Sequence, residues 1–129
     1  TDIQAAIARE QLRALPGFIS RRRELALRYS VAFEDLAITL PDFTEEDLAF
    51  RYVIQHDKIT ASSLIPMLER HGISARAPVF QPLHRVMKMD DASMPNTSRT
   101  QDKAVSLPLY PALTDGEADQ VIAAARAVL

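Results

Sequence analysis

The sequence predicts an α+β fold, in which a long bent N-terminal helix pair and further helices pack on a small, mostly antiparallel sheet of about three strands. Three observations predict it. Residues 3–36 are almost all good helix formers, three short segments have strand-like patterns, and two later helices are marked by capping residues. With 129 residues, 47% of them apolar, the chain is long enough for a single domain over residues 1–129.

The N-terminal segment is expected to form two helices, 3–15 and 16–37, that meet at a bend. Pro16 lacks an amide hydrogen, so it suits the first position of a helix better than the interior. Thr1 and Gln4 fit a capping box at the first start. Beyond the bend, apolar residues recur at helical spacings and form one stripe: Phe18, Ile19, Leu25, Ala26, Tyr29, Ala32, Phe33 and Leu36.

The sequence of residues 37–77 predicts a loop, a strand, a helix and a second strand, in that order. Residues 37–47 have the composition of a loop, and residues 48–55 alternate as in a strand with one buried face. That face is formed by Leu48, Phe50, Tyr52 and Ile54. A helix should begin at Ser62 or Ser63, because Pro66 is tolerated only in a first turn, and end at His71 with Gly72 in a left-handed conformation. Residues 73–77 should form a short second strand, stopped by Pro78.

The last third contains a long irregular segment between short elements. Residues 78–95 have three prolines and three methionines without clear periodicity, which makes them a candidate functional loop. A short helix over 96–103 and a strand over 105–107 follow. A capping box of Thr114 and Glu117 opens the final helix. That helix should bury Ala118, Val121, Ile122 and Ala125.

Composition excludes several classes of function. The net charge of −2 gives no general attraction to nucleic acid or to anionic membranes, and the absence of cysteine excludes disulfides and thiolate metal sites. No apolar run approaches the ~20 residues of a membrane span. No signal peptide is visible, which favours a cytoplasmic location. His56, His71 and His84 lack the spacing of metal ligands, so no metal site is expected.

No catalytic set is visible in the residues themselves. The serines lack a GxSxG setting, and three glycines cannot build a phosphate loop. The three lysines, Lys58, Lys88 and Lys103, lie in no apolar run and should be solvated. The triplet Arg21–Arg23 allows a phosphate-binding interpretation, but we expect Arg21 and Arg23 to be solvated and the stem of Arg22 to lie along the apolar stripe.

Three groups of residues resemble one known family in their order and spacing. The first group is Asp2 to Ile7, Gln11, Leu12, Arg21, Arg22 and Tyr29. The second is Leu68, Gly72, Ile73, Arg76 and the run Phe80-Gln81-Pro82-Leu83-His84. The third is residues 107–111, Leu113, Thr114, Glu117, Val121 and Ile122. Together they resemble the C-terminal small domain of DegT-type sugar aminotransferases, which are pyridoxal-phosphate-dependent enzymes of the aspartate aminotransferase fold.

The resemblance implies that the chain is part of a longer enzyme. In the family, the cofactor-binding lysine and most phosphate ligands lie in a larger N-terminal domain, which this chain does not include. The complete enzyme would bind pyridoxal phosphate, transfer an amino group to a keto-sugar nucleotide and form a homodimer. This chain alone should carry no catalytic residue and bind no cofactor. Its partners would be that large domain and the nucleotide-sugar substrate.

The same resemblance implies three substrate-binding candidates, namely Arg76, Phe80 and His84. Arg76 and His84 would hydrogen-bond or pair with the nucleotide sugar, and Phe80 would make apolar or stacking contact. Without such roles, Arg76 would be a solvated strand end, Phe80 a core residue and His84 a surface loop residue. The run Pro78-Val79-Phe80 departs from the His-Tyr type pair common in the family, so the identity of the sugar stays open.

Two other functions are compatible with the sequence. One is a non-catalytic binding or regulatory module of the same fold, with the helices as a partner surface. The other is a dehydratase of the same family, in which histidine replaces the cofactor-binding lysine. The residue that discriminates between transfer and dehydration lies outside this chain.

Overall fold

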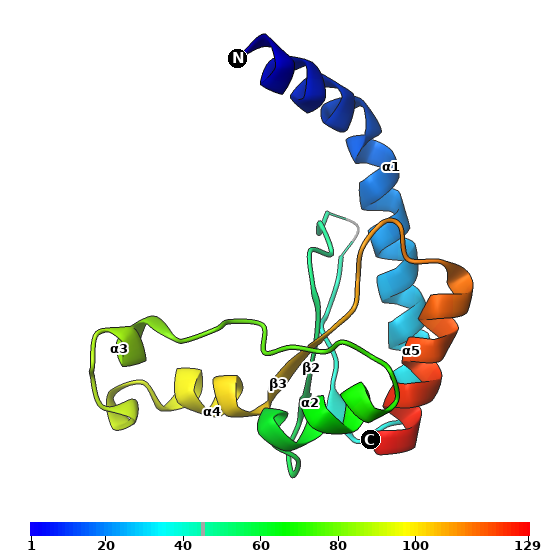
Figure 1. Cartoon of the computed structure of the whole chain (residues 1–129). Coiled ribbons are helices and arrows are strands. Elements are labelled where there is room, and N and C mark those ends of the chain that lie inside the picture. Colours follow the sequence, from blue (N-terminus) through cyan, green and yellow to red (C-terminus); the bar gives the residue numbers. More distant parts are fainter. Residues whose placement is uncertain (45) are drawn as a thin grey trace.

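The computed structural model describes residues 1–44 and 46–129 and confirms an α+β architecture with a three-stranded antiparallel sheet (Figure 1). Its elements in order are α1 (Asp2–Phe33), β1 (Ile38–Thr39), β2 (Tyr52–His56), α2 (Ala61–Arg70), α3 (Leu83–Val86), the 3-10 turn η1 (Asp91–Ser93), α4 (Pro95–Lys103), β3 (Ala104–Leu107) and α5 (Asp115–Val128). None of the helices in these described residues has the length and hydropathy to cross a membrane.

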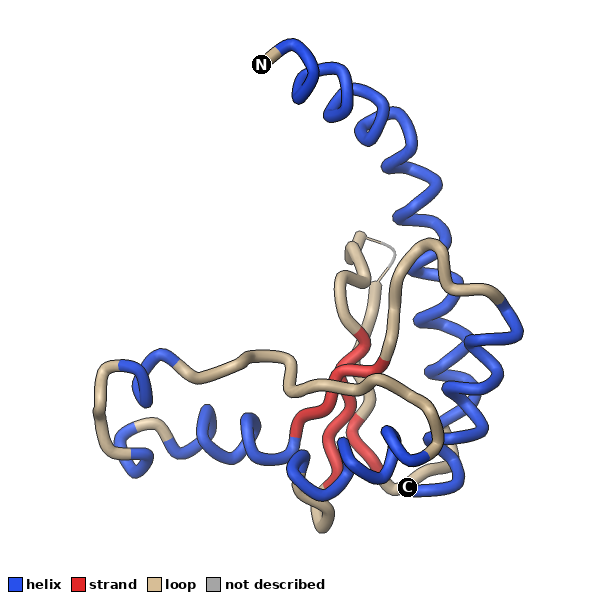
Figure 2. Tube along the Cα trace, in the orientation of Figure 1, coloured by secondary structure: helices blue, strands red, loops and turns tan. Residues whose placement is uncertain are grey.

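The N-terminal segment is one continuous helix, so the prediction of two separate helices is wrong. Pro16 lies inside α1, which runs for 32 residues. A proline removes one backbone hydrogen bond and bends a helix, but the good helix formers on both sides keep the helix intact here. The helix curves along its length, and its first half projects away from the sheet while its second half packs beside α5 (Figures 1 and 2).

The sheet order is β1-β2-β3. Two of its strands, β2 and β3, overlap predicted strands, but the predicted strand over residues 73–77 is not part of the sheet. Residues 73–77 make only an isolated bridge, between Arg76 and Ser106. The reason is local: the Ile73 amide donates to the Leu68 carbonyl at the end of α2, and the Ala75 amide donates to the Ile73 carbonyl. These groups are therefore not free for a ladder. The edge strand is instead β1, within the segment predicted as loop.

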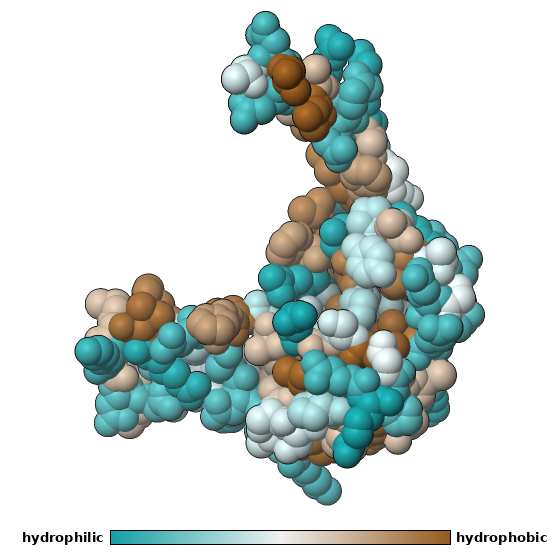
Figure 3. Space-filling model, in the orientation of Figure 1, coloured by the Kyte–Doolittle hydropathy of each residue, from teal (hydrophilic) through white to brown (hydrophobic). Residues whose placement is uncertain are grey.

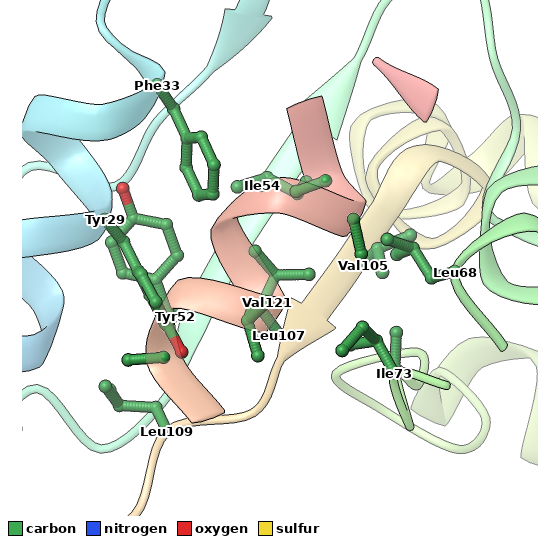
Figure 4. Packing of buried hydrophobic residues seen from close by; sticks show 14 of the residues in the cluster. Tyr29, Phe33, Tyr52, Ile54, Leu68, Ile73, Val105, Leu107, Leu109 and Val121 are labelled. Carbon is green, nitrogen blue, oxygen red and sulfur yellow. The ribbon is translucent and has the colours of Figure 1, made fainter. Parts of the chain in front are cut away.

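The core lies between one face of the sheet and the helices. Tyr52 of β2 pairs with Leu107 of β3, and Ile54 pairs with Val105, so these four side chains share the buried face. Buried side chains of α1, α2 and α5 pack against them (Figure 4). The helix residues buried there are Leu25, Ala26, Tyr29 and Phe33 from α1, Ala61, Leu64 and Leu68 from α2, and Ala118, Val121, Ala124, Ala125 and Val128 from α5.

The predicted strand over residues 48–55 is correct only in its second half. Ala49 has a positive φ of 47° and is buried, which breaks the alternation before β2 begins at Tyr52. Leu48 and Phe50 are therefore 51% and 64% exposed, although the simple alternation places them in the core. Both side chains become part of the molecular surface beside α1.

The helix ends follow the predicted capping chemistry in three of four places. The capping boxes Thr1–Gln4 and Thr114–Glu117 both form, and Gly72 after α2 has a φ of +80°. The start of α2 differs, because it begins at Ala61 and Pro66 therefore lies in its interior. The short helix predicted over 96–103 is confirmed as α4.

Candidate functional site

A lobe formed by residues 78–103 extends away from the sheet (Figures 1 and 2). The expected irregular loop in fact contains α3 and η1, and α4 returns the chain to β3. The side chain of Gln101 joins the two arms of the lobe, since its Nε2 donates to the Val79 carbonyl at 2.7 Å. Residues 78–103, predicted as a candidate functional loop followed by a short helix, thus form a small folded unit.

His84 lies inside this lobe and is only 5% exposed, so it is not a surface loop residue. Its Nε2 lies 2.9 Å from Asp91 Oδ1 and 3.1 Å from Ser98 Oγ. Arg85 donates from Nε and Nη2 to the two oxygens of Asp91, at 2.9 and 2.8 Å. Asp91 thus joins α3 to η1, and Ser98 joins both to α4.

The Arg85 guanidinium holds the pKa of Asp91 well below its usual range, and the hydrogen bond from His84 adds to this effect. Because the folded pKa lies below the unfolded value of about 3.9, the stabilisation from Asp91 is complete above that value. It is lost as the pH falls through the folded pKa.

We therefore expect Asp91→Asn to reduce the acid sensitivity of the fold. The variant should unfold at a lower temperature than the wild type at pH 7, and the difference should shrink as the pH falls below about 4. Thermal unfolding followed by circular dichroism between pH 7 and pH 2 measures this. Asp42→Asn is the control, because Asp42 is exposed and makes no ion pair within the described residues. A constant gap between wild type and Asp91→Asn at all pH values contradicts the expectation.

Arg76 and Phe80 lie together at the base of the lobe. They line a shallow hollow of about 450 Å³ with Arg51, Glu69 and neighbouring apolar residues. Phe80 is 99% exposed, so the alternative that it belongs to the core is wrong. Two arginines, one glutamate and an exposed aromatic ring line this hollow, so its lining has a net positive charge and suits a ligand that carries both negative charge and a planar ring. His84 does not line this hollow.

Besides Glu69, Arg51 is a polar member of this hollow that the sequence did not indicate. It precedes β2, and its Cζ lies 5.5 Å from the centre of the Phe50 ring. The only available signal was its position beside Tyr52, since neighbouring residues of an extended chain point to opposite faces. That position predicts that the Arg51 side chain is exposed, but it does not predict that Arg51 lines the same hollow as Arg76.

The triplet Arg21–Arg23 makes hydrogen bonds to other segments of the same chain. Arg21 Nη2 donates to the Leu113 carbonyl at 2.8 Å and to Asp115 at 2.7 Å, and it is not simply solvated as expected. Arg22 Nη1 donates to the carbonyls of Phe50 and Leu109, and Arg23 Nε donates to that of Asp47. These bonds attach the middle of α1 to the surrounding loops, so we assign the triplet no ligand.

Exposed apolar side chains gather on two projecting parts of the molecule (Figure 3). One part is the first half of α1 with the groove at its bend, about 640 Å³ in volume. Its exposed apolar residues include Ile3, Ile7, Leu12, Leu15, Phe18, Leu48 and Phe50. The other is the lobe, with Phe80, Leu83, Val86, Met87, Met89 and Met94. Apolar surface on this scale is typical of interaction sites.

The lysines do not fit a pyridoxal phosphate site. Lys58 and Lys88 are exposed, and Lys103 Nζ donates to the Asp57 carbonyl at 2.7 Å. A cofactor-binding lysine needs a desolvated pocket that lowers its pKa, and none of the three has one. In the same described residues, no group of three or more histidine or acidic side chains is arranged to hold a metal ion.

Fold and site together define a class: a small α+β domain with exposed apolar faces and a cationic, aromatic hollow, but without a lysine suited to hold a cofactor. The sequence pattern of the DegT/DnrJ/EryC1/StrS aminotransferase family matches residues 1–126. The chain belongs to this family, as the resemblance implied. Membership implies pyridoxal phosphate as the cofactor of a complete family enzyme.

Individual relatives agree with this assignment. The chain is 30% identical over 141 aligned positions to the spore coat polysaccharide biosynthesis protein SpsC of Bacillus subtilis, covering 99% of this chain and 36% of that protein. The structure of the aminotransferase TlmJ from Streptoalloteichus hindustanus superposes with a TM-score of 0.88 at 28% identity, over 98% of this chain and 35% of TlmJ. DesV of S. venezuelae gives 0.87 at 25% identity, over 96% and 35%. The chain thus spans about a third of these relatives.

Proposed function

We propose that this chain is the C-terminal small domain of a pyridoxal-phosphate-dependent aminotransferase that acts on a keto-sugar nucleotide. The observation that carries the proposal is the family match over residues 1–126 in a chain that spans only 35–36% of its relatives. The chemistry of amino transfer is then the task of the remaining part of the enzyme. The task of this domain is to hold the substrate and to close one side of its cleft.

The hollow at the base of the lobe supplies the substrate contacts in this proposal. Arg76 and Arg51 offer guanidinium donors to the phosphates of the nucleotide, and Phe80 offers an exposed ring for stacking. His84 contributes a ring nitrogen from the neighbouring lobe. The Asp91 ion pair with Arg85 keeps the lobe folded, so these groups keep their relative positions.

The apolar faces are docking surfaces for the large domain of the same polypeptide. The relatives are almost three times as long as this chain, so each has further residues that could cover such surfaces. The projecting helix and the lobe both carry apolar side chains, and a body seated between them would bury both (Figure 3). We further propose that the complete enzyme is a homodimer.

The complete polypeptide provides the direct test of this function. It should transfer an amino group from an amino acid to a keto-sugar nucleotide, detected by mass spectrometry of the sugar product. A lysine at the cofactor position of the large domain supports the proposal. A histidine there, with loss of water from the sugar and no amino transfer, would establish the dehydratase instead. A natural protein that has no large domain and binds a partner without catalysis would establish the binding module.

The isolated 129-residue chain should form no stable adduct with pyridoxal phosphate. None of its lysines lies in a desolvated pocket, so titration with the cofactor should produce no saturable absorbance band in the visible range. Borohydride reduction followed by peptide mapping measures any covalent capture. One stoichiometric adduct at a single lysine, abolished by its replacement with arginine, would contradict this.

The isolated chain should also self-associate through α1. Ile7 and Leu12 are exposed on its projecting half, where no other part of the described chain covers them. Sedimentation velocity should show a mean mass that rises with concentration in the wild type, and a monomer in Ile7→Glu/Leu12→Glu. Arg9→Glu/Arg13→Glu, on the same helix, should still associate. A wild type that stays monomeric at all concentrations argues against an apolar docking face.

A further inference from the structure

We propose that Asp91, together with Ser98, holds His84 in the form protonated at Nε2, so that Nδ1 is left as a bare acceptor that takes a hydroxyl or N–H group of a ligand. Asp91 is then a positioning residue, which acts through the His84 ring. The identity of the ligand as a sugar substrate rests on the proposed function, but the state of the ring does not.

The hydrogen positions follow from the partners of Nε2. An ionised carboxylate has no proton to give, so a contact of 2.9 Å between Asp91 Oδ1 and His84 Nε2 requires the proton to be on the nitrogen. The low pKa of Asp91, caused first by Arg85, keeps that carboxylate ionised at neutral pH. Ser98 fits the same arrangement, because its hydroxyl donates to the Asp91 carbonyl and its oxygen can accept from Nε2.

The solvent accessibility of His84 Nδ1 follows from the absence of a hydrogen-bond partner for it. Among the described residues, the side chain of His84 makes hydrogen bonds only through Nε2. In that same part of the chain, no fully buried side-chain nitrogen or oxygen lacks a hydrogen-bond partner. Nδ1 must therefore reach the surface, although the residue as a whole is 95% enclosed. His84 also lines a small hollow of about 230 Å³ with Leu83, Thr97 and three methionines (Met87, Met89 and Met94).

This arrangement determines which ligand groups suit the ring. A neutral imidazole has one donor and one acceptor nitrogen, and in the neutral form of His84 the donor is already used inside the protein. The remaining nitrogen pairs with a hydroxyl or an N–H group and has nothing to offer a phosphate oxygen. On the proposed function, the phosphates of a nucleotide sugar would then bind at the arginine hollow and a hydroxyl of the sugar at His84.

The test is nitrogen NMR of the protein labelled with 15N-histidine at pH 8, where an ordinary histidine is neutral. The chain has three histidines, and the other two are internal references. His71 is exposed and should show exchange-averaged nitrogens. His56 Nδ1 accepts from the amides of Lys58 and Ile59, at 2.9 and 3.0 Å, and should show the pure Nε2-protonated pattern.

For His84 we expect the pattern of His56: a protonated Nε2 and an unprotonated Nδ1. Averaged shifts like those of His71, a protonated Nδ1, or two protonated nitrogens would each overturn the proposal. In Asp91→Ala/Ser98→Ala, the His84 shifts should move to the averaged positions while His56 keeps its own, which shows that the domain remains folded. Inorganic phosphate should leave the wild-type His84 shifts unchanged, and a phosphate-induced protonation of Nδ1 contradicts the acceptor assignment. If the complete enzyme transferred no amino group to a keto-sugar nucleotide, the proposed function would be wrong, but these spectra would be unchanged.

Discussion

Phe33→Ala is expected to lower the free energy of unfolding by about 3–5 kcal/mol, the usual cost of deleting a fully buried aromatic ring. Phe33 has no exposed surface, and its ring lies 5.9 Å from that of Tyr29 and 6.4 Å from that of Tyr52. The substitution removes one of the aromatic contacts between α1 and β2 and leaves a cavity in the core, while the contact between Tyr29 and Tyr52 remains. Because domains of this size are stable by only about 5–15 kcal/mol, most of the stability would be lost.

Phe80→Ala is the matched control, since the same ring is removed from a site that is 99% exposed. Its effect on unfolding should stay within about 0.5 kcal/mol. Urea denaturation followed by circular dichroism measures both variants. Equal destabilisation by the two substitutions would mean that the ring of Phe80 is buried in solution, and the substrate-facing role proposed for it would then fail.

His84→Ala is expected to raise the KM of the complete enzyme for its sugar substrate by about 5- to 150-fold. This corresponds to the loss of one hydrogen bond in a sheltered site, roughly 1–3 kcal/mol. The binding atom in this account is Nδ1, and proton transfer in the reaction belongs to the large domain. The turnover number should therefore change less than KM.

One control variant and one second test variant accompany this experiment. His71→Ala should leave KM unchanged, because His71 is exposed at the end of α2. Asp91→Ala should also raise KM, since it frees the ring that Asp91 holds. An unchanged KM in His84→Ala would return His84 to a purely structural role inside the lobe.

Local signals in the sequence predicted the helices well and the sheet less well. Capping boxes and apolar periodicity depend on residues within four positions of each other, and the capping boxes at Thr1 and Thr114 formed as predicted. Two of the errors lie where one residue changes the backbone, whereas residues 73–77 form no strand because of local hydrogen bonds. Pro16 bends α1 without ending it, and the positive φ of Ala49 turns the side chains beside it outward.

The candidate site was only partly accessible to sequence reasoning. Arg76 and Phe80 are four residues apart, and the family resemblance was enough to select both. Arg51 reaches the same hollow from a segment 25 residues earlier, and sequence spacing does not reveal such a contact. The burial of His84 depends on Asp91 and Ser98, which lie 7 and 14 residues further along a segment without periodicity. The family resemblance selected His84, but only the structure shows that Asp91 and Ser98 contact its ring.

Stopped-flow measurement of the two halves of the reaction tests the central claim most directly, namely that this domain binds the sugar and takes no part in the chemistry with the amino donor. The complete enzyme should be compared with its Arg76→Ala and His84→Ala variants, and with Arg99→Ala, on an exposed face of α4, as a charge control. We predict that both site variants slow the reaction with the sugar at low substrate concentration at least fivefold and leave the reaction with the amino donor within twofold of wild type, on the order of one lost hydrogen bond. Equal losses in both reactions, or no loss in either, would contradict the account.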